Sequence, residues 1–194
     1  MNNKTAGTLT KQIAITAILL AICIASQFFK NLSVYITGPI INLCMVLAVM
    51  TSGLMWGLIL AVITPVTAFL IAASPVMTAV PGIIPLIMLG NASLVLMAYF
   101  CFRPAITGGK ALLGIRPILM AVLSCAVKGC LMGVTIGLWL LPTFLPEASP
   151  LRKKLPVFQT MFSITQFVTA IIGFAYFFII WKPLSKVLFT AKEQ

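Results

Sequence analysis

The chain has 194 residues, of which 61% are hydrophobic and only 8% charged, with a mean hydropathy of +1.17 and a net charge of +11. A soluble domain needs about a quarter charged residues to coat its surface, so this composition excludes a water-soluble globular protein. Apolar runs of about 18 residues or more recur, each long enough to cross a bilayer as a helix, and they predict an all-α integral membrane protein: a bundle of about six transmembrane helices forming a single membrane domain over residues 1–194.

The expected spans follow one another closely along the chain. We place them at about residues 11–29, 36–51, 58–73, 83–102, 117–141 and 157–181. The first span follows Lys4 and Lys11, as in a signal peptide, but it is long and lacks a small-x-small cleavage site. We therefore expect it to be a membrane helix that is retained.

Glycine and proline mark the connections between these spans. Gly38-Pro39 stands at the start of the second span, and residues 52–57 predict a very short turn before the third, in which Pro65 predicts a kink. Ser74–Pro85 has three prolines and no charge, which predicts an apolar loop that breaks the helix. Pro142–Pro156 is the longest predicted loop and carries Glu147 and a basic triplet.

The basic residues favour one orientation in the membrane. With six spans, both termini lie on the same side, and eight Lys and Arg residues fall on that side against four on the other. The eight are Lys4, Lys11, Arg103, Lys110, Arg116, Lys182, Lys186 and Lys192; the four are Lys30, Arg152, Lys153 and Lys154. We therefore expect both termini in the cytoplasm. The same bias accounts for the high net charge without nucleic acid.

The inventory of reactive side chains argues against an enzyme. The sequence has no His and no Asp, and Glu147 and Glu193 are its only acids, so we expect no metal and no cofactor of its own. It has no GxxxxGK[ST] loop, so ATP hydrolysis is not expected of this chain. The five cysteines, at positions 23, 44, 101, 125 and 130, form no CxxC pair and are interpreted as small core residues. A Ser–Lys pair at Ser124 and Lys128 stays open.

A few strong polar side chains lie within the spans. Lys128 falls about 12 residues from either end of the fifth span, near the bilayer midplane, where a charge is costly and usually faces a cavity or partner. We expect it to be a counter-ion for an anionic ligand; the alternative is a purely structural lysine that is neutral or satisfied by carbonyl groups. Four amides at similar depth are candidate substrate-binding residues, although helix-to-helix packing is the alternative for each: Asn42, Asn91, Gln159 and Gln166.

Two ladders of small residues predict close helix approach. Gly129, Gly133 and Gly137 repeat every four residues in the fifth span, where internal packing is the favoured interpretation. Ala17, Ala21 and Ala25 repeat in the same way in the first span, and they are candidates for docking a separate protein.

With these features the chain resembles the substrate-binding S-components of energy-coupling factor (ECF) vitamin importers of bacteria. The resemblance covers nearly the full length and rests on size, six spans, cytoplasmic termini and the ladder Ala17-x3-Ala21-x3-Ala25. GPIINLCMVLAVMTSGLMWG (Gly38 to Gly57) and VPGIIPLIMLGN (Val80 to Asn91) add to it.

The resemblance implies a function that fits the residue inventory. The chain would capture a small vitamin-like micronutrient, for which Lys128 favours an anion, from outside the bacterial plasma membrane. Its partners would be a transmembrane coupling subunit, docked on the alanine ladder, and two ABC-type ATPases that use the ATP. Ser74–Pro85 and Pro142–Pro156 would then act as lids. Two alternatives stay open: a self-sufficient secondary carrier or channel for a small solute, and an intramembrane enzyme using Lys128.

Overall fold

Six long apolar helices form the body of the protein. The structure, a computed structural model, describes residues 3–29, 33–107 and 114–190, and the side chains of 3–6, 103–107 and 186–190 are outside that description. The long helices are α1 (Asn3–Gln27), α2 (Val34–Ser52), α3 (Leu54–Ala72), α5 (Ile83–Thr107), α6 (Ile115–Met132) and α9 (Ile164–Thr190). The described ranges contain no strand, which confirms the predicted all-α membrane bundle.

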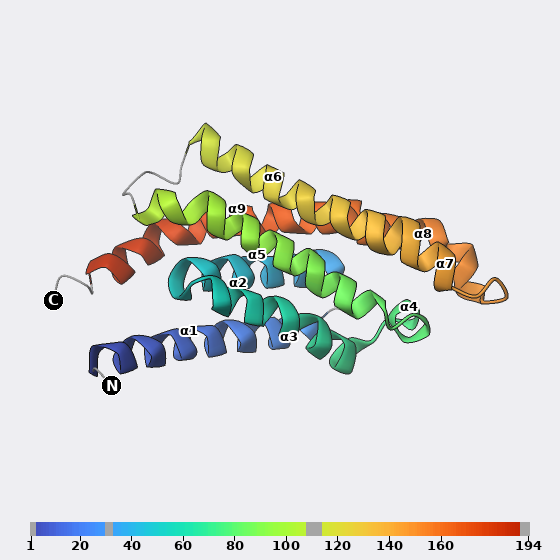
Figure 1. Ribbon diagram of the computed structural model, residues 1–194, viewed down its shortest axis with the longest axis horizontal. Coiled ribbons are helices and arrows are strands. Elements are labelled where there is room, and N and C mark those ends of the chain that lie inside the picture. The colour runs from blue at the N-terminus through green and yellow to red at the C-terminus, as the bar shows by residue number, and fades with distance from the viewer. Residues whose placement is uncertain (1–2, 30–32, 108–113, 191–194) are drawn as a thin grey trace.

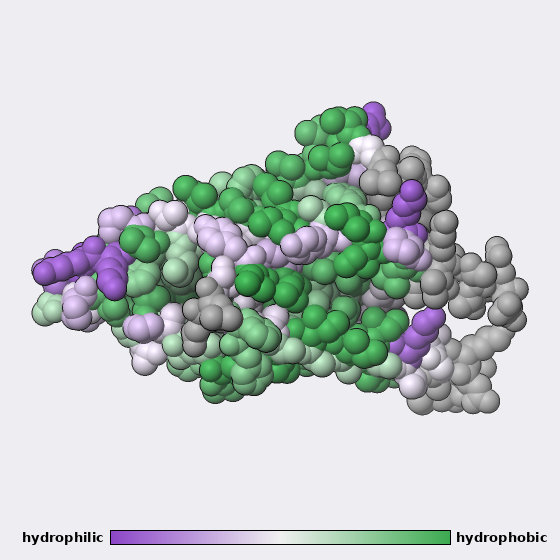
Figure 2. Space-filling view, turned by 180° about the vertical axis from the view of Figure 1, so that it is seen from behind, coloured by the Kyte–Doolittle hydropathy of each residue, from purple (hydrophilic) through white to green (hydrophobic). Residues whose placement is uncertain are grey.

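The two ends of the bundle differ. Figure 1 shows the N- and C-terminal ends of the chain at one end of the bundle, and the short helices α4 (Pro75–Ala79), α7 (Leu141–Phe144) and α8 (Leu155–Phe162) toward the other. We call these the terminal end and the far end. In Figure 2, hydrophobic side chains cover the flank of the bundle and the strongly hydrophilic ones gather at its two ends. This distribution suits a multi-pass membrane protein.

Helix α2 is the central element. It packs against α1, α3, α5 and α9, and it is the most buried of the six spans. Its connection to α3 is a single residue, Gly53, with a φ of 105°. Glycine adopts this angle readily, whereas other residues would be strained there. The predicted turn over 52–57 is therefore shorter than expected, because Trp56 and Gly57 already belong to α3.

Two hydrophobic cores divide the bundle along its length. The larger joins α1, α2, α3, α5, α6 and α9, and includes a cluster of aromatic rings from α5 and α9 toward the terminal end. The smaller joins α4, the start of α5, α7, α8 and the π-helical segment η1 (Gly133–Leu140) toward the far end. Lys128, Asn42 and Asn91 lie between residues of the two cores.

The prediction of a loop over Ser74–Pro85 is corrected by the structure. Ser74 caps a short helix, α4, in which Pro75 occupies the first turn, and α5 begins at Ile83. Proline is tolerated in the first turn because the N–H it lacks has no partner there. Pro75 and Pro85 therefore start helices, where the sequence interpretation took them to break one.

The sixth span is not the continuous helix that was expected over residues 157–181. It consists of α8 and α9, which are separated at Ser163, whose φ of −118° and ψ of −84° are not helical. The fifth span also changes its winding, because α6 continues as the π-helix η1 and then as α7. The long segment after α7 contains a 3₁₀ helix, η2 (Pro150–Lys154).

The glycine ladder of the fifth span faces this break. A Cβ on Gly129 would lie 2.9 Å from the Phe167 Cβ, and one on Gly133 would lie 2.8 Å from the Ser163 Cβ. Gly137 faces Gln159 at the ordinary distance of 3.5 Å. The ladder is thus used for internal packing, as the sequence predicted.

Other sequence predictions have mixed outcomes. All five cysteines are free thiols, as expected, but Cys130 is exposed on the flank of α6 and is not a core residue. Six of the basic residues that set the predicted orientation lie where the structure describes no side chain, so their contribution stays a prediction: Lys4, Lys30, Arg103, Lys110, Lys186 and Lys192.

Candidate functional site

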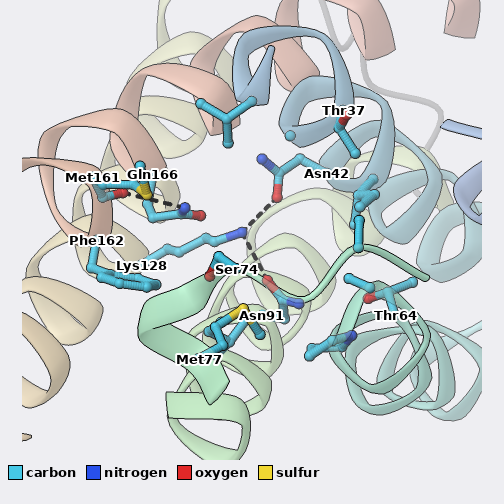
Figure 3. Close-up of a pocket in the computed structure, with 17 residues that line it drawn as sticks. Thr37, Asn42, Thr64, Ser74, Met77, Asn91, Lys128, Met161, Phe162 and Gln166 are labelled. Atoms are coloured by element: carbon cyan, nitrogen blue, oxygen red, sulfur yellow. Dashed lines mark hydrogen bonds between the residues drawn. The ribbon is translucent and has the colours of Figure 1, made fainter. Parts of the chain in front are cut away.

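A cavity of about 250 Å³ lies inside the bundle, where the two hydrophobic cores meet. Its wall is contributed by α2, α3, α4, α5, α6, α8 and α9. The apolar part includes Ile41 from the larger core and Ile87, Met77 and Phe162 from the smaller one. Met77 belongs to α4 and Phe162 to α8, so the two short helices contribute to the wall (Figure 3).

Lys128 is the charged residue of this cavity. It is 2% exposed, and its Nζ donates hydrogen bonds to Oδ1 of Asn42 at 2.6 Å and Oδ1 of Asn91 at 2.8 Å. It lies 13 residues after the start of α6 and 16 residues before the end of α7, about 20–24 Å along the axis from either end. The two amides come from α2 and α5, so the lysine ties together three helices that are far apart in sequence (Figure 3).

This arrangement reflects both interpretations of Lys128 that the sequence left open. Amide oxygens satisfy two of the three N–H groups of the ammonium, as in the structural alternative. An amide carries no charge, however, and the described residues of the cavity wall include no acid; the only acids of the sequence are Glu147 and Glu193. A protonated Lys128 would thus be hydrogen-bonded by neutral groups, with no acid among the described residues of the wall.

Gln166 joins Lys128, Asn42 and Asn91 at the cavity, and Gln159 does not. Gln166 stands in the first turn of α9, just after the break, and its Nε2 donates to the carbonyl of Met161 at 3.4 Å. Figure 3 shows its side chain on the same side of the cavity as Lys128. Gln159 instead donates to the Gly137 carbonyl at 3.1 Å and lines a separate groove on the flank, between η1 and α8. Its contact is helix-to-helix packing.

Two threonines of the wall were missed by the sequence analysis. Thr37 donates to the Ser26 carbonyl at 3.3 Å, and Thr64 donates to the Leu60 carbonyl at 2.8 Å. Gln27 of α1 in turn donates to the Thr64 carbonyl at 3.0 Å. Thr37 and Asn42 both line the cavity from α2, but a spacing of five residues does not put them on one helix face, so the sequence held no clear signal for Thr37. Thr64 stands beside Pro65, which had been marked only as a kink.

The alanine ladder lies on the outside of the bundle. Ala17, Ala21 and Ala25 are exposed, whereas Thr16, Leu19 and Cys23 on the opposite side of α1 are buried. At the end of α1, Ser26 and Gln27 are both buried and hydrogen-bonded to the cavity wall. Helix α1 therefore contributes no lining residue but contacts the cavity from behind.

The basic triplet at the far end is partly engaged in structure. Arg152 Nη1 donates to the carbonyls of Pro142 at 2.7 Å and Leu145 at 2.9 Å, which are the free carbonyls at the end of α7. Lys153 and Lys154 are exposed. Arg152 thus holds the 141–155 segment in place.

The site offers little for covalent chemistry. Ser124 Oγ donates to the Met120 carbonyl at 2.7 Å, one turn back in its own helix, while Lys128 Nζ is directed to the two amides. The Ser–Lys pair that the sequence left open is therefore not formed. In the ranges that the structure describes, His, Cys, Asp and Glu side chains nowhere gather in threes to hold a metal ion.

Comparisons with known proteins add no relative: no family model, no curated protein and no solved structure matches the chain.

Proposed function

We propose that the chain is a membrane-embedded binding subunit that captures a small solute for import. The observation that carries this proposal is the cavity within the bundle, in which a buried lysine and amides from three further helices converge on one space. A few placed polar groups in an otherwise apolar wall are typical of small-molecule sites. A volume of about 250 Å³ suits a small ligand.

The importer we propose is of the ECF type, with this chain as its S-component. In support, the alanine ladder of α1 is exposed, whereas the glycine ladder of the fifth span packs against α8 and α9 inside the protein. An exposed row of small residues allows another helix to approach closely. The partners are then a transmembrane coupling subunit and two ABC-type ATPases, and this chain itself is not an enzyme and carries no cofactor.

The same proposal sets the location and the orientation. The chain lies in the plasma membrane of a bacterium with both termini in the cytoplasm, so the far end, with α4 and the 141–155 segment, faces outward. In this orientation, solute reaches the cavity from outside past α4 and α8, which contribute to its wall.

An experiment on α1 tests the proposal by separating binding from coupling. Ala21→Leu, in cells that also make the coupling subunit and ATPases, should abolish ATP-dependent uptake because it prevents close helix approach. Binding by the purified chain, measured with the small molecule that co-purifies and is identified by mass spectrometry, should stay within a few-fold. Ile22→Leu, at the neighbouring exposed position, is the matched control and should leave both unchanged. Loss of affinity together with uptake would show that the ladder serves the fold and not a partner.

A self-sufficient secondary carrier is the second candidate, and the broken sixth span favours it. Discontinuous helices next to a midplane site are common in carriers, and here the break at Ser163 and the π-helix η1 lie close to the cavity. Transport into liposomes that contain only this chain would decide for the carrier. Uptake that needs the ATPases would decide for the S-component.

A further inference from the structure

The charge of the cavity is carried by one side chain. Among the described residues that line it, Lys128 alone is ionisable as a base, and no acid is present. A charge in the middle of a bilayer costs several kcal/mol, and two neutral amides offset that cost only in part. A ligand that brings one negative charge completes the compensation, whereas a neutral ligand leaves the cost in place.

The lysine also fixes the orientation of the two amides. An ammonium donates hydrogen bonds and accepts none, so Asn42 and Asn91 must each turn Oδ1 toward Nζ. Each Nδ2 then points away from the lysine, and neither donates to another described residue. Both side chains line the cavity, so their NH₂ groups are available there together with the third N–H of Lys128. We call these three groups the donor pole.

The rest of the wall has a different character. Ile41, Ile87, Met77 and Phe162 surround the donor pole with apolar surface. The hydroxyl groups of Thr37 and Thr64 already donate hydrogen bonds to backbone carbonyls, and Gln166 Nε2 donates to the Met161 carbonyl. The Ser74 hydroxyl and the second N–H of Gln166 add donors beside the donor pole, on the Lys128 side of the cavity (Figure 3). The remaining surface suits a hydrocarbon or aromatic body.

From this geometry we propose that the cavity binds a small amphipathic monocarboxylate, with its carboxylate on the donor pole of Lys128, Asn42 and Asn91 and its apolar body between Ile41, Ile87, Met77 and Phe162. This inference rests on the proposed function and names its class of substrate. A zwitterionic amino acid would bring an ammonium for which the described wall holds no carboxylate. A dicarboxylate would bring a second charge with no second cation.

A charge placed on the protein tests the electrostatic part without knowledge of the ligand. Asn91→Asp puts a carboxylate of almost the same shape beside Nζ, where it stands in for the ligand. The ligand-free variant should melt at a higher temperature than the wild type and should lose carboxylate binding by at least about 30-fold. Gln159→Glu is the control: it adds the same charge outside the cavity and removes the Gly137 hydrogen bond, so it should lower the melting temperature. A drop of the same size for Asn91→Asp would overturn the proposal.

The ligand class is tested with matched probes on the full-length protein in detergent. The probes are benzoate, hexanoate and phenylacetate, each with its carboxamide, together with phenylalanine as a zwitterion and phthalate as a dianion. At least one monocarboxylate should raise the melting temperature of the wild type, while its carboxamide, phenylalanine and phthalate should not. Lys128→Met, which keeps the length and removes the charge, should abolish the stabilisation. Equal stabilisation by a carboxamide or by phenylalanine, or none by any monocarboxylate, would overturn the inference.

Failure of this inference and failure of the proposed function have different signatures. Carboxylate binding without ATPase-dependent uptake would refute the importer and leave the donor pole intact. ATPase-dependent uptake of a neutral or zwitterionic solute would support the importer and refute the donor pole.

Discussion

Replacement of Gly173 by alanine is the sharpest test of how packing holds the site. Gly173 is buried in α9 at the point where this helix contacts α2. A Cβ there would lie 2.8 Å from the Asn42 Cβ, 3.0 Å from the Pro39 carbonyl oxygen and 3.2 Å from the Leu43 nitrogen. Two of these three atoms belong to the backbone, so a change of rotamer cannot relieve the contact. The two helices must move apart.

The size of the effect follows from these distances. Ordinary contacts begin near 3.4 Å, so α2 and α9 must separate by about 0.6 Å at the Asn42 Cβ, the difference between 2.8 and 3.4 Å. Overpacking of this kind costs about 1–3 kcal/mol, and the better helix propensity of alanine returns up to about 1 kcal/mol. The difference spans about 0–3 kcal/mol and centres on about 1–2 kcal/mol, equivalent to a melting temperature lower by about 2–8 °C for a chain of this size.

The same displacement reaches the donor pole, because Asn42 is itself the residue in contact. Its 2.6 Å hydrogen bond with Lys128 should lengthen, so the affinity for the co-purifying ligand should fall along with stability. Melting of the purified protein in detergent and a binding titration are the two measurements. Gly137→Ala is the matched control, since its nearest neighbour would lie at 3.5 Å and its stability should be unchanged or higher. If Gly173→Ala were as stable as Gly137→Ala, the close packing of α2 and α9 described here would be wrong.

Three further predictions concern the rest of the chain. Arg152→Ala should lose about 1–2 kcal/mol and speed hydrogen exchange over residues 141–155, because two carbonyls at the end of α7 lose a charged donor; the exposed Lys154→Ala should do neither. Gln27→Leu should change stability by less than about 1 kcal/mol in a melting experiment, since it removes one hydrogen bond and also a buried Oε1 that has no partner; a large loss would show that Gln27 supports the cavity wall. For topology, a membrane-impermeant thiol reagent on intact cells should label Ser149→Cys and spare Gly7→Cys, and the reverse pattern would invert the proposed orientation.

The number and type of the helices were predictable from the sequence because the bilayer imposes a minimum length on every apolar span. The positions at which these helices start or break were not predictable in the same way. Pro75 and Pro85 looked like helix breakers but start helices, since their effect depends on whether the missing N–H falls in a first turn. Ser163 gave no warning, because serine is common inside membrane helices. Its break becomes understandable only when α8 is seen to pack against the glycine ladder of the fifth span.

The candidate site residues were predicted from their expected depth alone, which leaves the direction of each side chain open. Counting residues placed Lys128, Asn42, Asn91, Gln159 and Gln166 at similar levels, since the rise per residue of a helix is fixed. The face that each residue presents depends on how the helices pack, and a bundle with apolar residues on every side gives little periodic signal from which to read it. Gln159 therefore lines a groove on the flank, whereas Asn42, Asn91 and Gln166 line the cavity.

The donor pole depends on more than the three side chains that form it. Asn42 is held where α2 meets Gly173 of α9, and a residue larger than glycine there would displace it. On the other side, Gly90 stands next to Asn91 in α5, and a Cβ at that position would collide with the Met132 side chain of α6. Each amide is thus set beside a glycine that lets its helix approach a neighbour closely. Lys128 can hydrogen-bond to both amides only if α2, α5 and α6 approach one another this closely. The glycines at these crossings are therefore as necessary to the proposed binding as Lys128 itself.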